Sequence, residues 1–95
     1  MYYVYVLQSI SDKKLYTGYT KDLKLRFKLH SQGKVVSTRN RLPIKIIYYE
    51  ACIDRIDAMR REIYLKSSFG KKFLKSRLKS YFTGPKKINK TTPVE

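Results

Sequence analysis

The segment LYTGYTKDLKLRFKLH, residues 15–30, contains the transition that decides the fold. Its first part, residues 15–19, is rich in aromatic and β-branched side chains and is typical of a strand. A helix is predicted to begin almost at once, with Thr20 as the N-cap and Asp22 in the first turn, where negative charge suits the helix dipole. The helix should run to about Ser31, and the following Gly33 is suited to capping its C-terminus.

This predicted helix places two polar residues on its apolar side. At helical spacing, Arg26 and His30 fall on the same side as Leu23 and Phe27. Arg26 is either a solvated cation or a guanidinium at the rim of the core that grips a phosphate. His30 is either a packed histidine bonded to the backbone or a phosphate contact or proton-transfer group.

The segments on both sides of residues 15–30 are predicted to form further strands and helices of one domain. Residues 2–8 are predicted to form a strand that is buried on both faces and pairs with residues 15–19 in an antiparallel hairpin. Residues 44–51 read as a third strand, and residues 55–70 as a helix capped by Asp54 and ended by Gly70. Residues 71–82 have near-helical apolar spacing. We therefore predict an α/β fold, more narrowly α+β: a small three-stranded, mainly antiparallel sheet flanked by helices, in the order β-β-α-β-α-α.

Length and cysteine content indicate one small domain. The 95 residues suffice for a single core, which we place at residues 1–82, followed by a flexible basic tail at residues 83–95. A single cysteine, Cys52, permits no internal disulfide and fits a reducing cytoplasm. The N-terminal MYYVYVLQS lacks a basic leader, and its apolar run is too short for a signal peptide or a membrane span.

Net charge is the strongest property of the whole sequence. Twenty-two Lys and Arg against seven acidic residues give a formal net charge of +15 at pH 7. Such a field suits a polyanion: a nucleic acid, an anionic membrane or an acidic protein. No long one-sided amphipathic helix suggests a membrane anchor, so nucleic acid is favoured. Charge alone does not separate DNA from RNA, or an enzyme from a binding protein.

The predicted helix at residues 55–70 carries a carboxylate, Glu62, inside its apolar half. One interpretation is an i,i+4 ion pair with Lys66 at the border of the core. The other is a carboxylate in a cleft that brings a divalent cation to a bound phosphate. The apolar half itself comprises Ala58, Met59, Ile63, Leu65 and Phe69.

Three residues of the predicted hairpin complete the candidate site. Tyr5 and Tyr16 lie on the paired strands, where tyrosines usually serve packing with the hydroxyl at an edge. Gly18 is best explained as a strand-end residue where backbone or ligand approaches closely.

Taken in order, these residues resemble the motifs of the GIY-YIG nuclease superfamily, and particularly its small stand-alone bacterial members. VYV at residues 4–6 loosely matches the first motif, and YTG at residues 16–18 matches the second. The tyrosines of the two motifs, Tyr5 and Tyr16, are eleven residues apart. The family arginine matches Arg26, a histidine found in many members matches His30, and the family glutamate matches Glu62. The resemblance covers about residues 1–80.

The resemblance implies roles for these residues. Glu62 would hold Mg²⁺ or Mn²⁺, and Arg26 would neutralise charge on the phosphoryl oxygens. Tyr16 would be the general base toward water, Tyr5 would orient the water, and His30 would assist or hold a phosphate.

The leading hypothesis is a metal-dependent endonuclease that acts on DNA, with branched, flapped or single-stranded structures in repair or recombination as the expected substrates. The alternatives are a nucleic-acid-binding module that cuts poorly and a basic scaffold that binds RNA or protein. The expected oligomeric state is a monomer or a weak homodimer. The predicted nucleic-acid contacts are Thr38, Arg39, Arg41, Lys66, Lys71 and Lys72.

Overall fold

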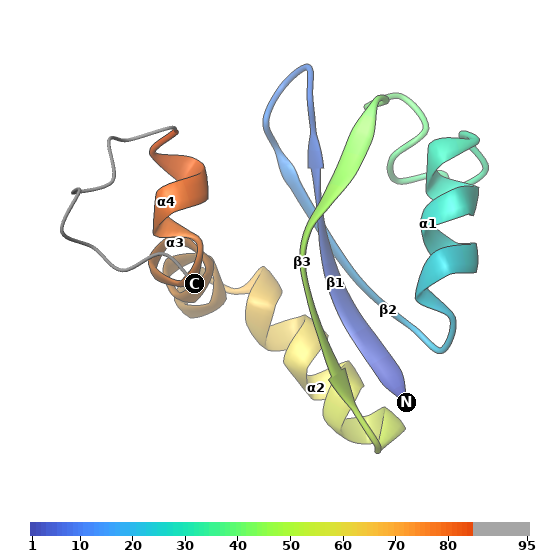
Figure 1. The fold of residues 1–95 in the computed structure, drawn as a ribbon. Helices are drawn as coiled ribbons and strands as arrows, with labels where there is room; N and C mark the ends of the chain where they lie inside the picture. Colours follow the sequence, from blue (N-terminus) through green and yellow to red (C-terminus); the bar gives the residue numbers. More distant parts are fainter. Residues whose placement is uncertain (85–95) are drawn as a thin grey trace, which may run out of the picture.

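The computed structural model describes residues 1–84, which contain one three-stranded antiparallel sheet (Figure 1). Strands β1 (Tyr2–Ser9) and β2 (Leu15–Thr20) form the predicted hairpin, and β3 (Ile44–Cys52) pairs with the other side of β1. The strand order is therefore β2-β1-β3, and β2 is an edge strand. This edge is where the candidate site lies.

The central strand supplies both halves of the core, because alternate residues of a strand point to opposite faces. On one face, Val4 and Val6 pack with Ala58, Leu65 and Leu74 of the helices α2 (Arg55–Lys66) and α3 (Ser68–Arg77). On the other face, the apolar cluster includes Tyr5, Leu7 and Ile44, and side chains of α1 (Leu23–Ser31) pack against it. Burial of β1 on both faces, predicted from its continuous apolar run, is confirmed.

Helix α1 begins later than the sequence suggested. Its N-cap is Asp22, whose carboxylate accepts a hydrogen bond from the Leu25 backbone N–H at 3.0 Å. The prediction of Thr20 as the cap is wrong, because the Thr20 hydroxyl instead bonds the backbone N–H and C=O of Asp22. The predicted C-terminal glycine is confirmed: Gly33 has φ of 74° and its N–H donates to the carbonyl of His30 at 3.0 Å.

The predicted helix at residues 55–70 is two helices. Asp54 caps α2 as predicted, but α2 ends at Lys66, and the Ser67 hydroxyl caps α3 by accepting from the Gly70 N–H at 3.2 Å. Gly70 therefore does not stop a helix. It lies in the first turn of α3, where an added Cβ would come within 2.7 Å of the Leu65 carbonyl carbon. The absence of a side chain lets α3 turn tightly against the end of α2.

Two residues of the apolar half predicted for the helix at residues 55–70 do not face the core. Ile63 is 67% exposed and Phe69 is 70% exposed, so neither belongs to the core. The buried residues of α2 are Ala58 and Leu65, and Ile63, two positions from Leu65, faces away from it at about 100° per residue.

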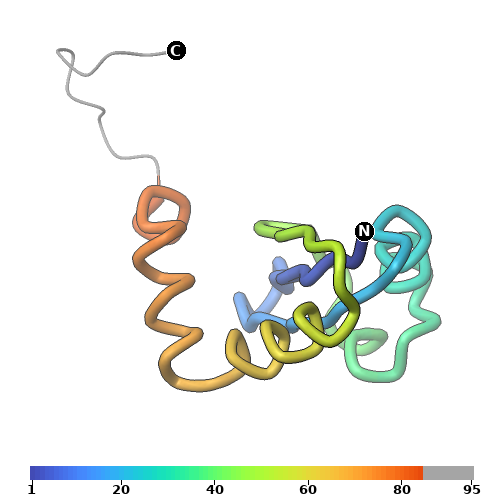
Figure 2. Tube along the Cα trace, turned by 90° about the horizontal axis from the view of Figure 1, so that it is seen from below, coloured from blue at the N-terminus to red at the C-terminus, as the bar shows by residue number. Residues whose placement is uncertain are grey.

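The predicted element order is confirmed, with one addition. The helix expected at residues 71–82 is the second part of α3 followed by a four-residue helix α4 (Lys79–Phe82). In Figures 1 and 2, α3 and α4 run beside the sheet, at the end of the molecule away from α1. The predicted tail lies outside the described residues except for Thr83 and Gly84, so the domain boundary stays a prediction. No helix within residues 1–84 is long and apolar enough to cross a membrane.

Candidate active site at the edge of the sheet

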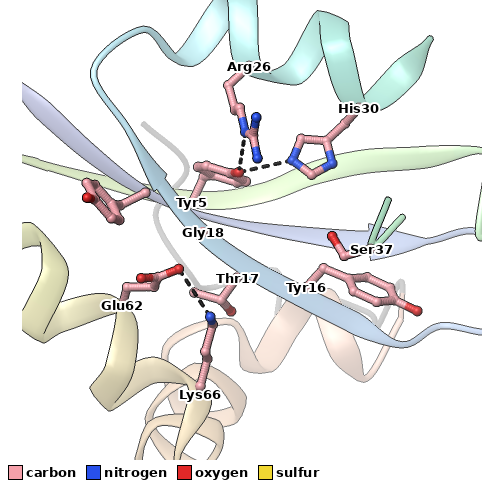
Figure 3. A pocket seen from close by; sticks show the side chains of 10 residues that line it. Tyr5, Tyr16, Thr17, Gly18, Arg26, His30, Ser37, Glu62 and Lys66 are labelled. Atoms are coloured by element: carbon pink, nitrogen blue, oxygen red, sulfur yellow. Dashed lines mark hydrogen bonds and ion pairs between the residues drawn. The ribbon is translucent and has the colours of Figure 1, made fainter. Parts of the chain in front are cut away.

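A cleft of about 320 Å³ opens at the edge strand β2 (Figure 3). It is built from both sides of this strand: α1 supplies side chains above it and α2 supplies side chains below it, as the figure shows. All five predicted catalytic residues line this cleft, together with Gly18 and Lys66. The complete lining is Tyr5, Tyr16, Thr17, Gly18, Tyr19, Arg26, His30, Ser37, Glu62 and Lys66.

Gly18 allows the central strand to contribute to a site at the edge. Tyr5 of β1 lies opposite Gly18 in the strand register. A Cβ added at Gly18 would come within 2.6 Å of the Tyr5 ring carbon Cζ and would also meet its hydroxyl oxygen. The missing side chain therefore leaves the space through which the Tyr5 hydroxyl reaches the cleft. The predicted close approach at Gly18 is present, but the Tyr5 side chain makes it and not backbone or ligand, and Gly18 lies inside β2 and not at its end.

The Tyr5 hydroxyl is the centre of a hydrogen-bonded chain on the α1 side. Arg26 Nε donates to the Tyr5 oxygen at 3.3 Å, and this oxygen lies 3.0 Å from His30 Nε2. The other ring nitrogen of His30, Nδ1, lies 2.7 Å from the hydroxyl oxygen of Thr38. His30 is 3% exposed and Thr38 is fully buried. The chain therefore fixes both the position of Tyr5 and the orientation of the imidazole.

The charge state of His30 follows from its surroundings. Burial lowers the pKa of His30 below its ordinary value, and the positive charge of Arg26 lowers it further. The imidazole is therefore neutral at pH 7, with one ring nitrogen free to accept a proton. Arg26 Nε can only donate, so the Tyr5 oxygen accepts from it and the Tyr5 O–H is available to donate to His30 Nε2. With its proton on Nδ1, His30 then donates to the Thr38 hydroxyl, and every hydrogen bond of the chain is satisfied.

The α2 side of the cleft is held much more loosely. Glu62 forms an ion pair with Lys66 at 3.1 Å, and the two side chains are 18% and 56% exposed. This is the i,i+4 pair that the sequence allowed, but it lies in the cleft. No other carboxylate lines the cleft, and residues 1–84 contain no group of three or more potential metal ligands. Glu62 fits a divalent cation that takes one protein carboxylate and completes its shell with water and phosphate oxygens.

The remaining predicted nucleic-acid contacts do not gather in this cleft. The prediction for Thr38 is wrong for this structure, since Thr38 has no exposed surface and supports His30 from behind. Arg41 pairs with Asp12 of the β1–β2 turn at 3.6 Å. Arg39, Lys71 and Lys72 are exposed and lie outside the lining of the cleft.

Three lining residues were missed. Thr17 sits between two motif residues, and strand alternation could have placed it on the opposite face from Tyr16, toward Lys66. The same alternation could have indicated Tyr19. Ser37 lies in the segment between α1 and β3, where nothing in the sequence marks it as a lining residue.

Comparison with known proteins agrees with the fold and the motifs. Residues 1–75 match the family model described as the GIY-YIG catalytic domain. A UPF0213 protein of Streptococcus agalactiae serotype V is 49% identical over 65 residues, which are 67% of this chain and 73% of that protein. A UPF0213 protein of Streptococcus pyogenes serotype M3 is 48% identical over 65 residues, which are 67% and 70% of the two chains.

A solved structure shows the same fold. The solution NMR structure of a UPF0213 protein from Bacillus halodurans superposes with a TM-score of 0.50 at 38% identity, covering 81% of this chain and 85% of that chain. This chain belongs to the GIY-YIG family and resembles its small stand-alone members. The predicted family resemblance is thereby confirmed.

Proposed function

We propose that the protein hydrolyses phosphodiester bonds of DNA with the help of Mg²⁺ or Mn²⁺. The observation that carries this proposal is the convergence, in one cleft, of an arginine, a tyrosine hydrogen-bonded to a buried histidine, and a carboxylate. Membership of a nuclease superfamily supports the same reaction class. A formal net charge of +15 supports a nucleic-acid substrate.

Tyr5 is better placed than Tyr16 to accept a proton from the attacking water. Tyr5 is bonded to both Arg26 and His30, whereas Tyr16 makes no side-chain hydrogen bond to any residue within the described part of the chain. As water attacks phosphorus, it would give its proton to the Tyr5 oxygen while the Tyr5 proton moves to His30 Nε2. The bond from phosphorus to the leaving DNA oxygen would break in the same displacement, and the leaving oxygen would take a proton from solvent. Tyr16, which lines the same cleft, would contact the water or the phosphate. This exchanges the two tyrosine roles that the resemblance implied.

Arg26 would compensate the charge that develops on phosphate. Its Nε is used by Tyr5, so its two terminal nitrogens are left to donate to phosphoryl oxygens. An interaction of this kind, fixed before the reaction, is commonly the largest single contribution to catalysis.

Glu62 would hold the metal ion. When bound, Mg²⁺ or Mn²⁺ supplies positive charge and a Lewis acid next to the scissile phosphate. In this structure Lys66 forms an ion pair with the Glu62 carboxylate. The Lys66 side chain is 56% exposed, so it is free to move toward solvent or toward a DNA phosphate.

The substrate and setting are finer parts of the same proposal. A single small cleft at a sheet edge suits one strand at a time, which supports branched, flapped or single-stranded DNA and a role in repair. The single cysteine supports a cytoplasmic location. We propose that one protomer is sufficient for one cut.

A binding module that cuts weakly is the second candidate. Two observations favour it: Glu62 is the one carboxylate among the described residues that line the cleft, and it is already paired with Lys66. Metal dependence separates the two candidates, because a binding module holds DNA without Mg²⁺ and its function does not require the Glu62 carboxylate.

The test is cleavage of labelled branched, flapped and single-stranded DNA with Mg²⁺ or Mn²⁺. Wild type is compared with Glu62→Gln and Arg26→Ala, each checked for folding by circular dichroism. Asp57→Asn and Arg60→Ala are matched controls, since both residues are exposed on α2 and lie outside the lining of the cleft. We expect cleavage by wild type and both controls and its loss in both cleft variants. If folded wild type binds DNA but cuts neither DNA nor an RNA control, the binding module replaces the nuclease.

A further inference from the structure

A second and larger groove, of about 1180 Å³, lies between the β1–β2 turn and the α3–α4 helices. Six lysines from separate parts of the chain line it. Lys13 and Lys14 come from the turn, Lys45 from the start of β3, Lys71 and Lys75 from α3, and Lys79 from α4. Among the residues 1–84 that line this groove, none is acidic.

The six positive charges are not neutralised by the part of the chain that the structure describes. The ion pairs formed within residues 1–84 are Arg41–Asp12, Arg61–Glu50 and Lys66–Glu62, and none includes a lysine of the groove. Asp12, in the same turn, forms its ion pair with Arg41 and accepts a hydrogen bond from the Lys14 backbone N–H at 2.9 Å. Gathering like charges around one groove opposes folding, and such a surface attracts a polyanion.

The two walls of the groove are joined at its base. Gln8 is 7% exposed, and its side-chain amide donates to the carbonyl oxygen of Lys13 at 3.0 Å. The other end of the same side chain accepts a hydrogen bond from the Tyr81 hydroxyl of α4. Lys13 has φ of 65°, a left-handed conformation that a side chain other than glycine seldom adopts. The turn is therefore held in shape by a buried contact to the opposite wall.

Aromatic rings accompany the lysines. Tyr81 and Phe82 lie with ring centroids 5.4 Å apart, and Lys45 Nζ lies 5.0 Å from the centre of the Tyr81 ring. Tyr81 is 39% exposed. Cationic side chains along a groove together with partly exposed aromatic side chains are the combination that binds single-stranded nucleic acid, because an unpaired base can stack on a ring. A duplex keeps its base faces covered.

The groove connects with the catalytic cleft. A depression of about 360 Å³ lies between them, and it shares Tyr16, Thr17, Ser37 and Lys66 with the cleft. It shares Leu15 and Lys71 with the groove. A continuous path therefore runs along the edge strand β2, from the lysines of α3 and α4 to the cleft.

We propose that this six-lysine groove binds a single-stranded DNA arm of the substrate and leads it to the cleft. The destination of the arm rests on the proposed nuclease function, whereas binding in the groove can be tested without cleavage. The groove would follow phosphates and stack bases, and it would have little sequence preference.

The experiment measures binding of a short labelled single-stranded DNA to the full chain by fluorescence anisotropy, in EDTA so that no cleavage occurs. The groove variant is the triple substitution Lys45→Gln, Lys75→Gln and Lys79→Gln. The matched control is Lys24→Gln, Lys28→Gln and Lys34→Gln, which removes the same charge from exposed positions on and after α1. Circular dichroism checks that both variants fold.

We expect the groove variant to bind the single strand at least tenfold more weakly than wild type. The slope of log affinity against log salt should also become less steep by about 2, because each of the three lost phosphate contacts contributes about 0.7 on a single strand. The control should change affinity less than threefold. Equal losses in both triple variants would show a diffuse electrostatic field and overturn the groove. An equal effect on duplex DNA, or tenfold tighter binding of single-stranded RNA, would overturn the assignment to single-stranded DNA.

The two proposals fail separately. Binding of the single strand is measured in EDTA, so its outcome does not depend on whether the protein is a nuclease. If the groove variant binds normally while wild type cuts, the groove inference is wrong and the nuclease stands. If the groove variant loses binding while Glu62→Gln cuts at the wild-type rate, the groove stands and the catalytic assignment fails.

Discussion

The two sides of the cleft differ in how firmly their functional groups are held. On the α1 side, Arg26, Tyr5, His30 and Thr38 form an unbroken hydrogen-bonded chain with its last two members buried. On the α2 side, Glu62 has one contact of this kind, the ion pair with Lys66. The first side is fixed by folding, and the second can be rearranged by a ligand.

This difference matches the demands of the proposed reaction. Groups that stabilise developing charge act best when they are already in place, because no reorganisation is then required during reaction. A metal-binding carboxylate must instead exchange its partner when the ion arrives. Substitutions on the α1 side should therefore change stability and activity together, whereas those on the α2 side should change activity or metal requirement alone.

The largest effect is expected for Arg26→Lys, which tests the α1 side. Lysine keeps the charge but lacks Nε and the planar fork, so it cannot bond Tyr5 and grip a phosphate at once. We expect kcat to fall by about 10²–10³-fold, the usual loss when one fixed donor is removed. Arg60→Lys, on the exposed surface of α2, is the control in the same steady-state cleavage assay. Full activity of Arg26→Lys would show that charge alone suffices.

Thr38→Val should show that the buried end of the same chain supports the site. The substitution preserves shape but leaves His30 Nδ1 without its partner at a buried position. An unsatisfied buried group costs about 1–3 kcal/mol, so the free energy of unfolding in urea should fall by that amount. Activity should fall as well, because the His30 ring is no longer fixed. Thr38→Ser keeps the hydroxyl and should retain more activity than valine; equal losses would contradict a role for the hydrogen bond.

Mild acid should loosen the α1 side before the rest of the molecule. The pKa of His30 is lowered by burial and by Arg26, so the folded state favours the neutral ring. This contribution to stability is fully present above the unfolded pKa of about 6.5 and is lost as pH falls through the folded value.

The measurement is the free energy of unfolding in urea at several pH values below 7. His30 is the only histidine, so His30→Gln should flatten the profile just below pH 6.5. The lowered pKa values of Asp12 and Glu50 affect stability at more acidic pH and are unchanged in this variant. An unaltered profile in His30→Gln would contradict the role of His30.

The smallest effect is expected on the α2 side, for Lys66→Met. Removing the lysine frees the Glu62 carboxylate, and an i,i+4 pair is worth about 0.3–0.5 kcal/mol. The Mg²⁺ concentration for half-maximal cleavage at saturating DNA should therefore fall about twofold, with folding unchanged. A higher Mg²⁺ requirement would instead show that Lys66 holds the carboxylate in its active position.

Much of the molecule could be predicted from local sequence. The alternation and apolar content of residues 2–8, 15–19 and 44–51 predict three strands, because such side chains suit a pleated surface buried on one or both faces. Asp54 and Gly33 mark helix ends through their own hydrogen-bonding and backbone preferences. The order and spacing of the motif residues indicate the family and five candidate catalytic residues.

Other features depend on contacts between distant segments. The break after Lys66 was missed because it requires Gly70 to pack on the end of α2. Thr38 looked like a surface residue until the fold placed it behind His30, eight positions earlier. The choice between Tyr5 and Tyr16 likewise depends on partners from α1 that spacing does not reveal.

The sequence by itself determined the elements, the charge and the candidate residues, because these follow from local propensity and composition. Only the tertiary structure decided that Arg26 and Glu62, on helices from opposite faces of the sheet, meet around the edge strand β2. It also gathered six lysines from separate segments into one groove. Both features arise from long-range packing around β1, and no local pattern in the chain encodes which side chains that packing brings together.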